Sequence, residues 1–363
     1  MSLPEADRIG HKGVKSSIKK LKNCKKIVEV NLSSEKVKDE FDKAYEGIRR
    51  VASVPGYRVG KVPRDLLELH YSKTAREEVI KKLIPETYQK ILEQHKLSPI
   101  GYPDITDVKL DLKEGFSYKA SIETRPDFSL KNYKGLKLKR KPAEVKEEDV
   151  QKNLESLRET NAQNVPRKDS EEKEKVLPKL DDELAKDLGF ENLGKLKDVI
   201  RQNLKHRLEH EMKADLEMQV ISQLVDGLNF EIPESLVNSE KERLLEDVNK
   251  RVNYMETLQK KENPDKKFTL SDKDKKELET NAQKQALRQV KAFFILDKIA
   301  QAEKVYLKQE EIDKRIEEMA VQYKKSKDEI KRYLEKNHML DEMAINMRNS
   351  KVMEFLLKEA KIS

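Results

Sequence analysis

The feature that most constrains the fold is a long apolar stripe of helical period in the second half of the chain. Apolar residues recur every three or four positions from Leu193 to Leu228, a length of about ten helical turns. The stripe consists of Leu193, Leu196, Ile200, Leu204, Leu208, Met212, Leu216, Val220, Leu224 and Leu228. One helix of this length is long for a globular domain, so the stripe predicts an extended helical architecture.

Composition agrees with this prediction. The 363 residues are 40% charged and 36% hydrophobic, with 11 Gly, 12 Pro and no Trp, a mix typical of long solvated helices. No run approaches the roughly 18 apolar residues of a membrane-spanning helix, and the first thirty residues lack an apolar stretch of signal-peptide length. We therefore expect a cytoplasmic protein of two or three domains that does not enter membranes.

The first 130 residues combine two periodicities. Alternation of apolar and polar residues predicts strands over 26–32, 105–112 and 116–122. Helical spacing predicts helices over 35–51 and 63–95. These residues are therefore predicted to form an α+β domain.

Beyond it, the charged stretch 164–179 is interpreted as a linker. After the long stripe, Pro233 opens another helix at an allowed first-turn position. Further helices are predicted over 271–302, 308–323, 327–336 and 340–358. The fold class expected is an α+β N-terminal domain followed by an extended all-α domain, in a multidomain and predominantly helical chain.

A basic segment precedes the first predicted strand. The formal net charge is +8, and eight cations lie near the start of the chain with no acidic residue among them. Such a segment favours an anionic partner such as RNA, and a solvated terminal tail is the equally good alternative. The eight are Arg8, Lys12, Lys15, Lys19, Lys20, Lys22, Lys25 and Lys26.

The segment Pro55–Pro63, with the sequence PGYRVGKVP, lies between two predicted helices. Two Gly and two Pro in nine residues exclude a helix interior and predict a stiff turn. Tyr57 offers a ring for stacking, and Arg58, Lys61 and the following Arg64 offer cations suited to phosphate or carboxylate. An ordinary connection between helices is the alternative interpretation.

This segment resembles the G-F-R-x-G-K-x-P signature of the trigger factor family, bacterial chaperones that dock beside the ribosomal exit tunnel. The matching positions are Gly56, Arg58, Gly60, Lys61 and Pro63. Tyr57 replaces the Phe of the family with another aromatic residue, whereas Val59 stands where the family commonly has Lys. The resemblance implies a ribosome-binding loop of residues 56–61 together with Arg64, and the uncharged Val59 implies a lower affinity for the ribosome.

The resemblance continues through 98–103 and 122–142. It implies an N-terminal extension over residues 1–13, a ribosome-binding domain over 14–135, a connector over 136–175 and a helical substrate-binding domain over 176–363. The family ordinarily carries an FKBP-like prolyl isomerase domain of about a hundred residues between the last two regions. Only 161–175 stands there in this chain, so we expect no isomerase domain and no enzymatic activity.

The helical half contains eight of the nine methionines. Thioether side chains adapt to irregular partners, although a methionine stripe fills a core more often than it binds a ligand. The buried body is predicted at Phe293, Phe294, Leu296 and Ile299. The apolar residues predicted to bind substrate are Met255, Leu258, Met319, Tyr323, Met343 and Met347.

No catalytic motif is present. His206 and His210 have metal-ligand spacing, but both lie off the apolar stripe and are expected in solvent. The sequence contains no Gly-rich phosphate loop, no G-x-S-x-G elbow, no H-E-x-x-H and a single cysteine, Cys24. We expect no cofactor, no metal and no active site.

The function implied is that of an ATP-independent chaperone. The partners implied by the resemblance are the large ribosomal subunit, through an exit-tunnel protein and rRNA, unfolded nascent polypeptides and a second copy of the chain off the ribosome. Three alternatives remain: a retained prolyl isomerase activity, a periplasmic-type chaperone, and an RNA-binding protein that uses the basic segment.

Overall fold

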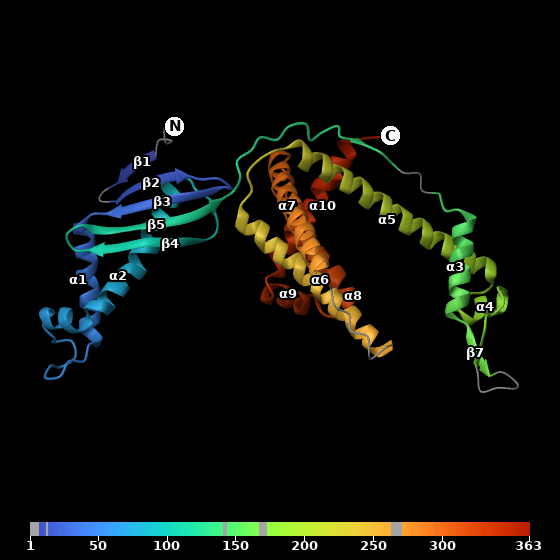
Figure 1. Cartoon of the computed structure of the whole chain (residues 1–363), viewed down its shortest axis with the longest axis horizontal. Helices are drawn as coiled ribbons and strands as arrows, with labels where there is room; N and C mark the ends of the chain where they lie inside the picture. The colour runs from blue at the N-terminus through green and yellow to red at the C-terminus, as the bar shows by residue number, and fades with distance from the viewer. Residues whose placement is uncertain (1–6, 12–13, 141–143, 167–172, 263–270) are drawn as a thin grey trace. The chain divides into compact units, whose positions relative to one another are not determined.

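The computed structural model of the chain describes residues 7–11, 14–140, 144–166, 173–262 and 271–363 (Figure 1). It divides the chain into two compact units, each built from two separate stretches of sequence. Unit 1 comprises Met1–Ser129 and Asn229–Phe294, and unit 2 comprises Leu130–Leu228 and Ile295–Ser363. Among the described residues, no helix combines the length and the apolar character that crossing a bilayer requires.

Unit 1 contains a five-stranded antiparallel sheet with the strand order β1-β2-β3-β5-β4. The predicted strands correspond to β3, to the second part of β4 and to β5. The bounds are β1 Asp7–His11, β2 Val14–Lys20, β3 Lys25–Leu32, β4 Pro99–Asp111 and β5 Gly115–Thr124.

Helices α1 (Ser34–Val51) and α2 (Arg64–Gln94) pack on one face of this sheet. Alternate residues of β3 and β5, such as Val28 and Tyr118, are buried against the apolar sides of both helices, as the period of two predicts. Inside this core, the hydroxyl groups of Tyr118 and Thr87 lie 2.9 Å apart and bond to each other, which satisfies both buried polar groups.

The structure corrects the interpretation of the basic segment as a free arm or tail. Residues 14–20 form β2, which pairs with β3 along its whole length, and Asp7–His11 form β1 on the outer side of β2. Ile18 and Val14 pack against the core. The strand was missed because apolar residues are few in it, whereas backbone pairing with β3 and the packing of Val14 and Ile18 hold it in place.

The second stretch of unit 1 contains α6 (Glu234–Glu262) and the first part of α7 (Asp272–Ala302). Phe128 and Phe230 stack with ring centroids 4.0 Å apart, next to a cluster built on Val237, Val290 and Phe294. The Lys25 ammonium pairs with the Glu234 carboxylate at 2.7 Å. Apolar packing and an ion pair therefore join the two stretches of this unit.

Unit 2 is mainly helical and also contains two small sheets. Strand β6 pairs in parallel with β9, and β7 pairs with β8 in an antiparallel hairpin. The bounds are β6 Lys137–Leu138, α3 Glu147–Thr160, β7 Gln163–Pro166, β8 Lys173–Val176, α4 Asp182–Asp187, α5 Leu193–Gly227, α8 Gln309–Tyr323, α9 Lys327–Lys336, α10 Met339–Glu359 and β9 Lys361–Ile362.

Helix α5 confirms the long helix that the stripe predicts. Its first half is buried against α3 and α4 through residues such as Leu196 and Leu204, and Val220 and Leu224 are buried near its end. Between these two parts, Leu208, Met212 and Leu216 are only half-buried. The stripe is continuous in sequence, but neighbouring elements cover it fully only towards the two ends.

Two other predictions have different outcomes. The interpretation of 164–179 as a plain linker is wrong for 164–166 and 173–176, because Gln163–Pro166 and Lys173–Val176 pair as strands; 167–172 lie outside the described residues. Backbone pairing between strands does not depend on apolar side chains, so the charged composition of this segment did not indicate the hairpin. The buried body is confirmed at Phe294, Leu296 and Ile299, whereas Phe293 is half-buried.

Candidate functional site

The 55–63 loop joins α1 to α2 through two successive four-residue turns. The Tyr57 N–H donates to the Val54 carbonyl at 3.1 Å, and the Lys61 N–H donates to the Arg58 carbonyl at 3.0 Å. Gly56 and Gly60, the third residues of these turns, have φ values of +86° and +84°. A positive φ at the third position is what a type II turn requires, and Pro55 occupies the favoured second position of the first turn.

Both ends of the loop are anchored in the core of unit 1. Val54 is 6% exposed and Val62 is 2% exposed, and both belong to the cluster formed by the sheet, α1 and α2. Pro63 then precedes the first residue of α2 with an extended backbone. The two anchors and the two turns fix the path of the backbone between Val54 and Val62.

The side chains between the anchors face solvent. Tyr57 is 45% exposed and Val59 is 54% exposed. Arg58 and Lys61 are also exposed, and neither side chain makes a hydrogen bond or ion pair with any residue that the structure describes. The loop therefore presents one aromatic ring and two uncompensated cations on a stiff backbone.

Arg64 has a different environment from the other predicted docking residues. Its guanidinium lies 3.9 Å from the centre of the Tyr45 ring, and it pairs with Glu68 at 2.6 Å and with Asp42 at 3.0 Å. These contacts join the start of α2 to α1. They occupy the guanidinium that the sequence interpretation offered to an external phosphate, so a positioning role fits this residue better.

Two further cations extend the basic surface and were missed by the sequence interpretation. Arg49 and Arg50 lie in the last turn of α1, and both are exposed. No acidic residue occurs between Gly47 and Arg64. This acid-free stretch around the loop is the sequence signal for the two arginines.

The predicted substrate residues divide between the two units. In unit 1, Met255 is 57% exposed and Leu258 is 39% exposed, both on α6. Tyr254, which the sequence interpretation missed, is 64% exposed and lies next to Met255. Residues three or four apart on a helix are neighbours, so Leu258 lies beside both Tyr254 and Met255, and the three residues form one apolar surface, here named the α6 patch.

In unit 2, the predicted residues are more closely packed. Met319 and Met343 pack against the cluster of Ile316, Ile330 and Leu334 between α8 and α9. Both side chains are half-buried there, which is the environment of the core-filling alternative; their role in substrate binding stays a prediction. Met347 is also half-buried, whereas Tyr323 is 60% exposed.

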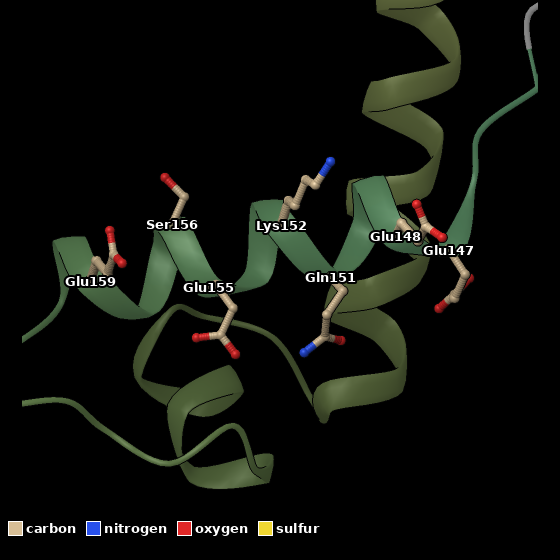
Figure 2. Close-up of a pocket in the computed structure, with 7 residues that line it drawn as sticks. All are labelled: Glu147, Glu148, Gln151, Lys152, Glu155, Ser156 and Glu159. Carbon is tan, nitrogen blue, oxygen red and sulfur yellow. The ribbon is translucent and has the colours of Figure 1, made fainter.

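A hollow of about 600 Å³ lies along α3 (Figure 2). Figure 2 shows Gln151 and Glu155 pointing to one side of the helix and Lys152 and Ser156 to the other. All residues that line the hollow belong to this one helix, and their polar groups do not converge on a common point. The lining residues are Glu147, Glu148, Gln151, Lys152, Glu155, Ser156 and Glu159.

The histidine pair on α5 follows its prediction. His206 and His210 are both exposed, and the His206 imidazole lies 3.6 Å from Glu209. Among the described residues, no group of three or more His, Cys, Asp or Glu side chains is arranged to hold a metal ion.

Comparisons with family models match two parts of the chain. Residues 14–157 match the model described as bacterial trigger factor protein (TF), and residues 192–358 match the model described as bacterial trigger factor protein (TF) C-terminus. Residues 158–191 lie outside both matches. This stretch is shorter than the about 50 residues of a small domain.

Curated relatives align over nearly the whole chain. The trigger factor of Geotalea uraniireducens is 26% identical and the alignment covers 95% of this chain and 98% of the relative. Trigger factor of Carboxydothermus hydrogenoformans is 28% identical over 92% and 97%, and that of Aquifex aeolicus 27% over 93% and 85%. The Geotalea alignment runs over 431 positions, more than the 363 residues here, so that relative contains residues that this chain lacks.

A solved structure has the same fold. It comes from work on promiscuous substrate recognition by the trigger factor chaperone, and it superposes with a TM-score of 0.54 over 94% of this chain and 99% of its own, at 18% identity. The two family models together cover well over half of the residues. The chain therefore belongs to the bacterial trigger factor family of chaperones.

Proposed function

We propose that this protein is a ribosome-associated, ATP-independent chaperone that docks through the 55–63 loop near the exit of the nascent-chain tunnel. The observation that carries the proposal is the pair of uncompensated cations, Arg58 and Lys61, on a loop fixed by two turns and two buried valines. A stiff cationic tip loses little conformational entropy on binding, so a small contact area is enough for a reversible complex.

The chemistry of the tip suits the large ribosomal subunit. Arg58 can contact a phosphate or carboxylate through two parallel hydrogen bonds, and Lys61 supplies a point charge. Tyr57 can stack on an exposed base or pack on an apolar side chain. We therefore assign both rRNA and a protein at the tunnel exit as partners, with Arg49 and Arg50 extending the basic surface and Arg64 holding the base of the loop.

The second half of the function is the shielding of emerging chains by exposed apolar surface. The α6 patch is the best-defined surface of this kind, and Tyr323 offers another in unit 2. Docking raises the effective concentration of these surfaces near a nascent chain to the order of mM. Each apolar contact can then be weak and rapidly reversed, so release requires no nucleotide.

The proposal includes a division of labour along the chain. Residues 14–135 bind the ribosome, 136–175 connect, and 176–363 bind substrate, with 1–13 as an extension. We propose that the protein acts in the cytoplasm, forms a dimer off the ribosome and has no prolyl isomerase activity. A peptide assay tests the last point, since acceleration of the slow cis/trans exchange of a prolyl peptide would contradict it.

The decisive experiment is co-sedimentation with purified ribosomes. We expect Arg58→Ala/Lys61→Ala to reduce binding to ribosomes. The slope of log affinity against log salt concentration, here called the salt slope, should become less steep by about two, because two cationic contacts are lost. The matched control is Lys19→Ala/Lys81→Ala, which removes two exposed cations of the same unit outside the loop. Equal binding of the loop variant and the wild type at low salt would refute the docking assignment.

A further inference from the structure

Unit 1 contains a hollow of about 590 Å³ that has no part in the docking loop. It lies between α1, α2, the end of β4 and the turn that joins β4 to β5, so four elements around one core contribute to it. The lining residues are Phe41, Tyr45, Ser72, Lys73, Arg76, Leu110, Asp111, Leu112 and Lys113.

The floor of the hollow is apolar. Phe41, Tyr45 and Leu110 are 9%, 6% and 6% exposed, and Leu112 contributes a side chain that is 48% exposed. Phe41 and Tyr45 stack on each other at 6.2 Å, and the Arg64 guanidinium covers the Tyr45 ring. Because the ring faces are occupied in this way, the floor suits an inserted apolar side chain better than a stacked base.

The rim of the hollow is cationic. Within the part of the chain that the structure describes, the side chains of Lys73, Arg76 and Lys113 make no hydrogen bond or ion pair. Asp111 is the acid on the rim, and one of its carboxylate oxygens accepts the N–H groups of Lys113 at 2.7 Å and Glu114 at 3.0 Å. These hydrogen bonds, together with the nearby charges of Lys113 and Arg76, hold the pKa of the Asp111 carboxyl below its usual range.

We propose that this hollow binds acidic and apolar segments of unfolded client chains. One bulky apolar side chain enters above Phe41 and Leu110, and neighbouring Asp or Glu side chains pair with Lys73, Arg76 and Lys113. Three cations against one carboxylate give the rim an excess of positive charge, which selects carboxylates next to the inserted residue. The inference rests on the proposed chaperone function and adds to it a second client site with a charge preference, which lies within the segment 14–135 assigned above to ribosome binding and is separate from the α6 patch.

The test measures fluorescence anisotropy of labelled peptides with the full chain. The first probe is a peptide of alternating Leu and Glu, the second has Lys in place of Glu, and the third is a single-stranded RNA oligonucleotide. We expect the wild type to prefer the acidic peptide. We expect Lys73→Glu/Arg76→Glu to bind the acidic peptide about tenfold more weakly at low ionic strength, with a smaller loss at high salt.

The matched control is Lys19→Glu/Lys81→Glu, which makes the same change of net charge outside the hollow and is expected to keep wild-type peptide affinity. A second variant, Leu112→Ser, changes the half-exposed apolar wall without opening a core cavity, and we expect weaker binding of the acidic peptide. Equal affinity of the wild type and of Lys73→Glu/Arg76→Glu for that peptide overturns the proposal. Loss of RNA binding with peptide binding intact also overturns it, because the rim would then be a nucleic-acid contact.

Failure of this inference is distinguishable from failure of the proposed function. If the hollow binds no acidic peptide, the wild type still co-sediments with ribosomes and the loop variant still binds them more weakly. If the docking assignment is wrong instead, Arg58→Ala/Lys61→Ala binds ribosomes normally, whereas the effect of Lys73→Glu/Arg76→Glu on the peptide persists.

Discussion

The phenolic hydroxyl of Tyr71 bonds to both backbone groups of Ser53, two residues before the 55–63 loop begins. It accepts the Ser53 N–H at 3.2 Å and donates to the Ser53 carbonyl at 3.1 Å. Tyr71 also has a non-helical backbone inside α2, with φ −122° and ψ 15°. A local break in α2 therefore coincides with the residue that ties α2 to the entry of the loop.

This pair leads to a prediction about affinity that does not involve charge. We expect Tyr71→Phe to weaken ribosome binding, because Ser53 loses both partners and the start of the loop gains freedom. The free energy of unfolding should fall by about 1 kcal/mol. Co-sedimentation over a salt series, with urea unfolding alongside, should show lower affinity with an unchanged salt slope. Tyr102→Phe is the control, since Tyr102 is fully exposed, and an equal loss in both variants would contradict the anchoring role.

The uncharged Val59 makes a gain-of-function prediction possible. Val59 is 54% exposed at the second position of the second turn, where a Lys side chain fits without displacing neighbours. We expect Val59→Lys to raise ribosome affinity at low salt about three- to tenfold. The decrease of log affinity with log salt concentration should become steeper by about one, as expected for one added cationic contact. Val59→Gln is the control for side-chain length. Equal affinity of the Lys and Gln variants would show that this position does not face an anionic surface.

The glycines of the loop are predicted to matter through backbone conformation alone. A Cβ added at Gly60 would meet no atom within 4 Å, but φ there is +84°. We expect Gly60→Ala to lower the free energy of unfolding by about 1 kcal/mol. Gly47→Ala is the control: it is equally open but lies inside α1, where Ala should stabilise by about 0.5–1 kcal/mol. Urea unfolding of both variants checks the opposite signs.

Cys24 gives a prediction about pH. Burial, followed by the charges of Glu231 and Glu123, raises the pKa of this thiol to about 11. Its sulfur donates to the Glu231 carbonyl at 3.2 Å. Since the thiolate is the reactive form, alkylation should be slow at neutral pH and should accelerate up to about pH 11. The protonated thiol also favours the folded state, so its contribution is complete below the pKa of an unfolded thiol and is lost as pH rises towards about 11. Rapid alkylation of the folded protein at neutral pH would contradict the assignment.

The sequence predicted those parts of the fold that follow from a single periodicity. The stripe from Leu193 to Leu228 became α5, and alternation in 116–122 became β5, because in both cases one face of the element is buried. Strand β2 and the hairpin of β7 and β8 were missed, since backbone pairing supports them without a strong apolar pattern. Periodicity detects burial, and it does not detect hydrogen bonds between strands.

The candidate site shows the same limit. The turn at Gly56 and Gly60 was predictable because only glycine adopts these φ values readily. The pairing of Arg64 with Asp42 and Tyr45 depends on how α1 packs against α2 and has no local pattern in the sequence. The hollow at Lys73 and Lys113 joins residues from separate elements. A site whose residues come from separate elements can therefore be identified only once the packing of those elements is known.

The α6 patch supports a final prediction about chaperone activity. Tyr254, Met255 and Leu258 are exposed on one helix face, and such a surface can cover an apolar segment of a client only while it remains apolar. We expect Met255→Ser/Leu258→Ser to suppress the aggregation of a refolding protein less well than the wild type at equal concentration. Because both side chains already face solvent, the stability of the protein should change by less than about 0.5 kcal/mol.

The matched control for the α6 patch is Leu69→Ser/Met218→Ser, which removes one exposed Leu and one exposed Met from α2 and α5, where they are 73% and 69% exposed. If exposed apolar area in general were responsible, both double variants would lose activity equally. If the α6 patch binds clients, the loss is confined to Met255→Ser/Leu258→Ser, and ribosome co-sedimentation stays at the wild-type level because the docking loop is intact. Light scattering during refolding, measured with and without ribosomes, separates these outcomes. Tethering to the ribosome strengthens a weak affinity for the client, but it has no effect when the affinity is absent.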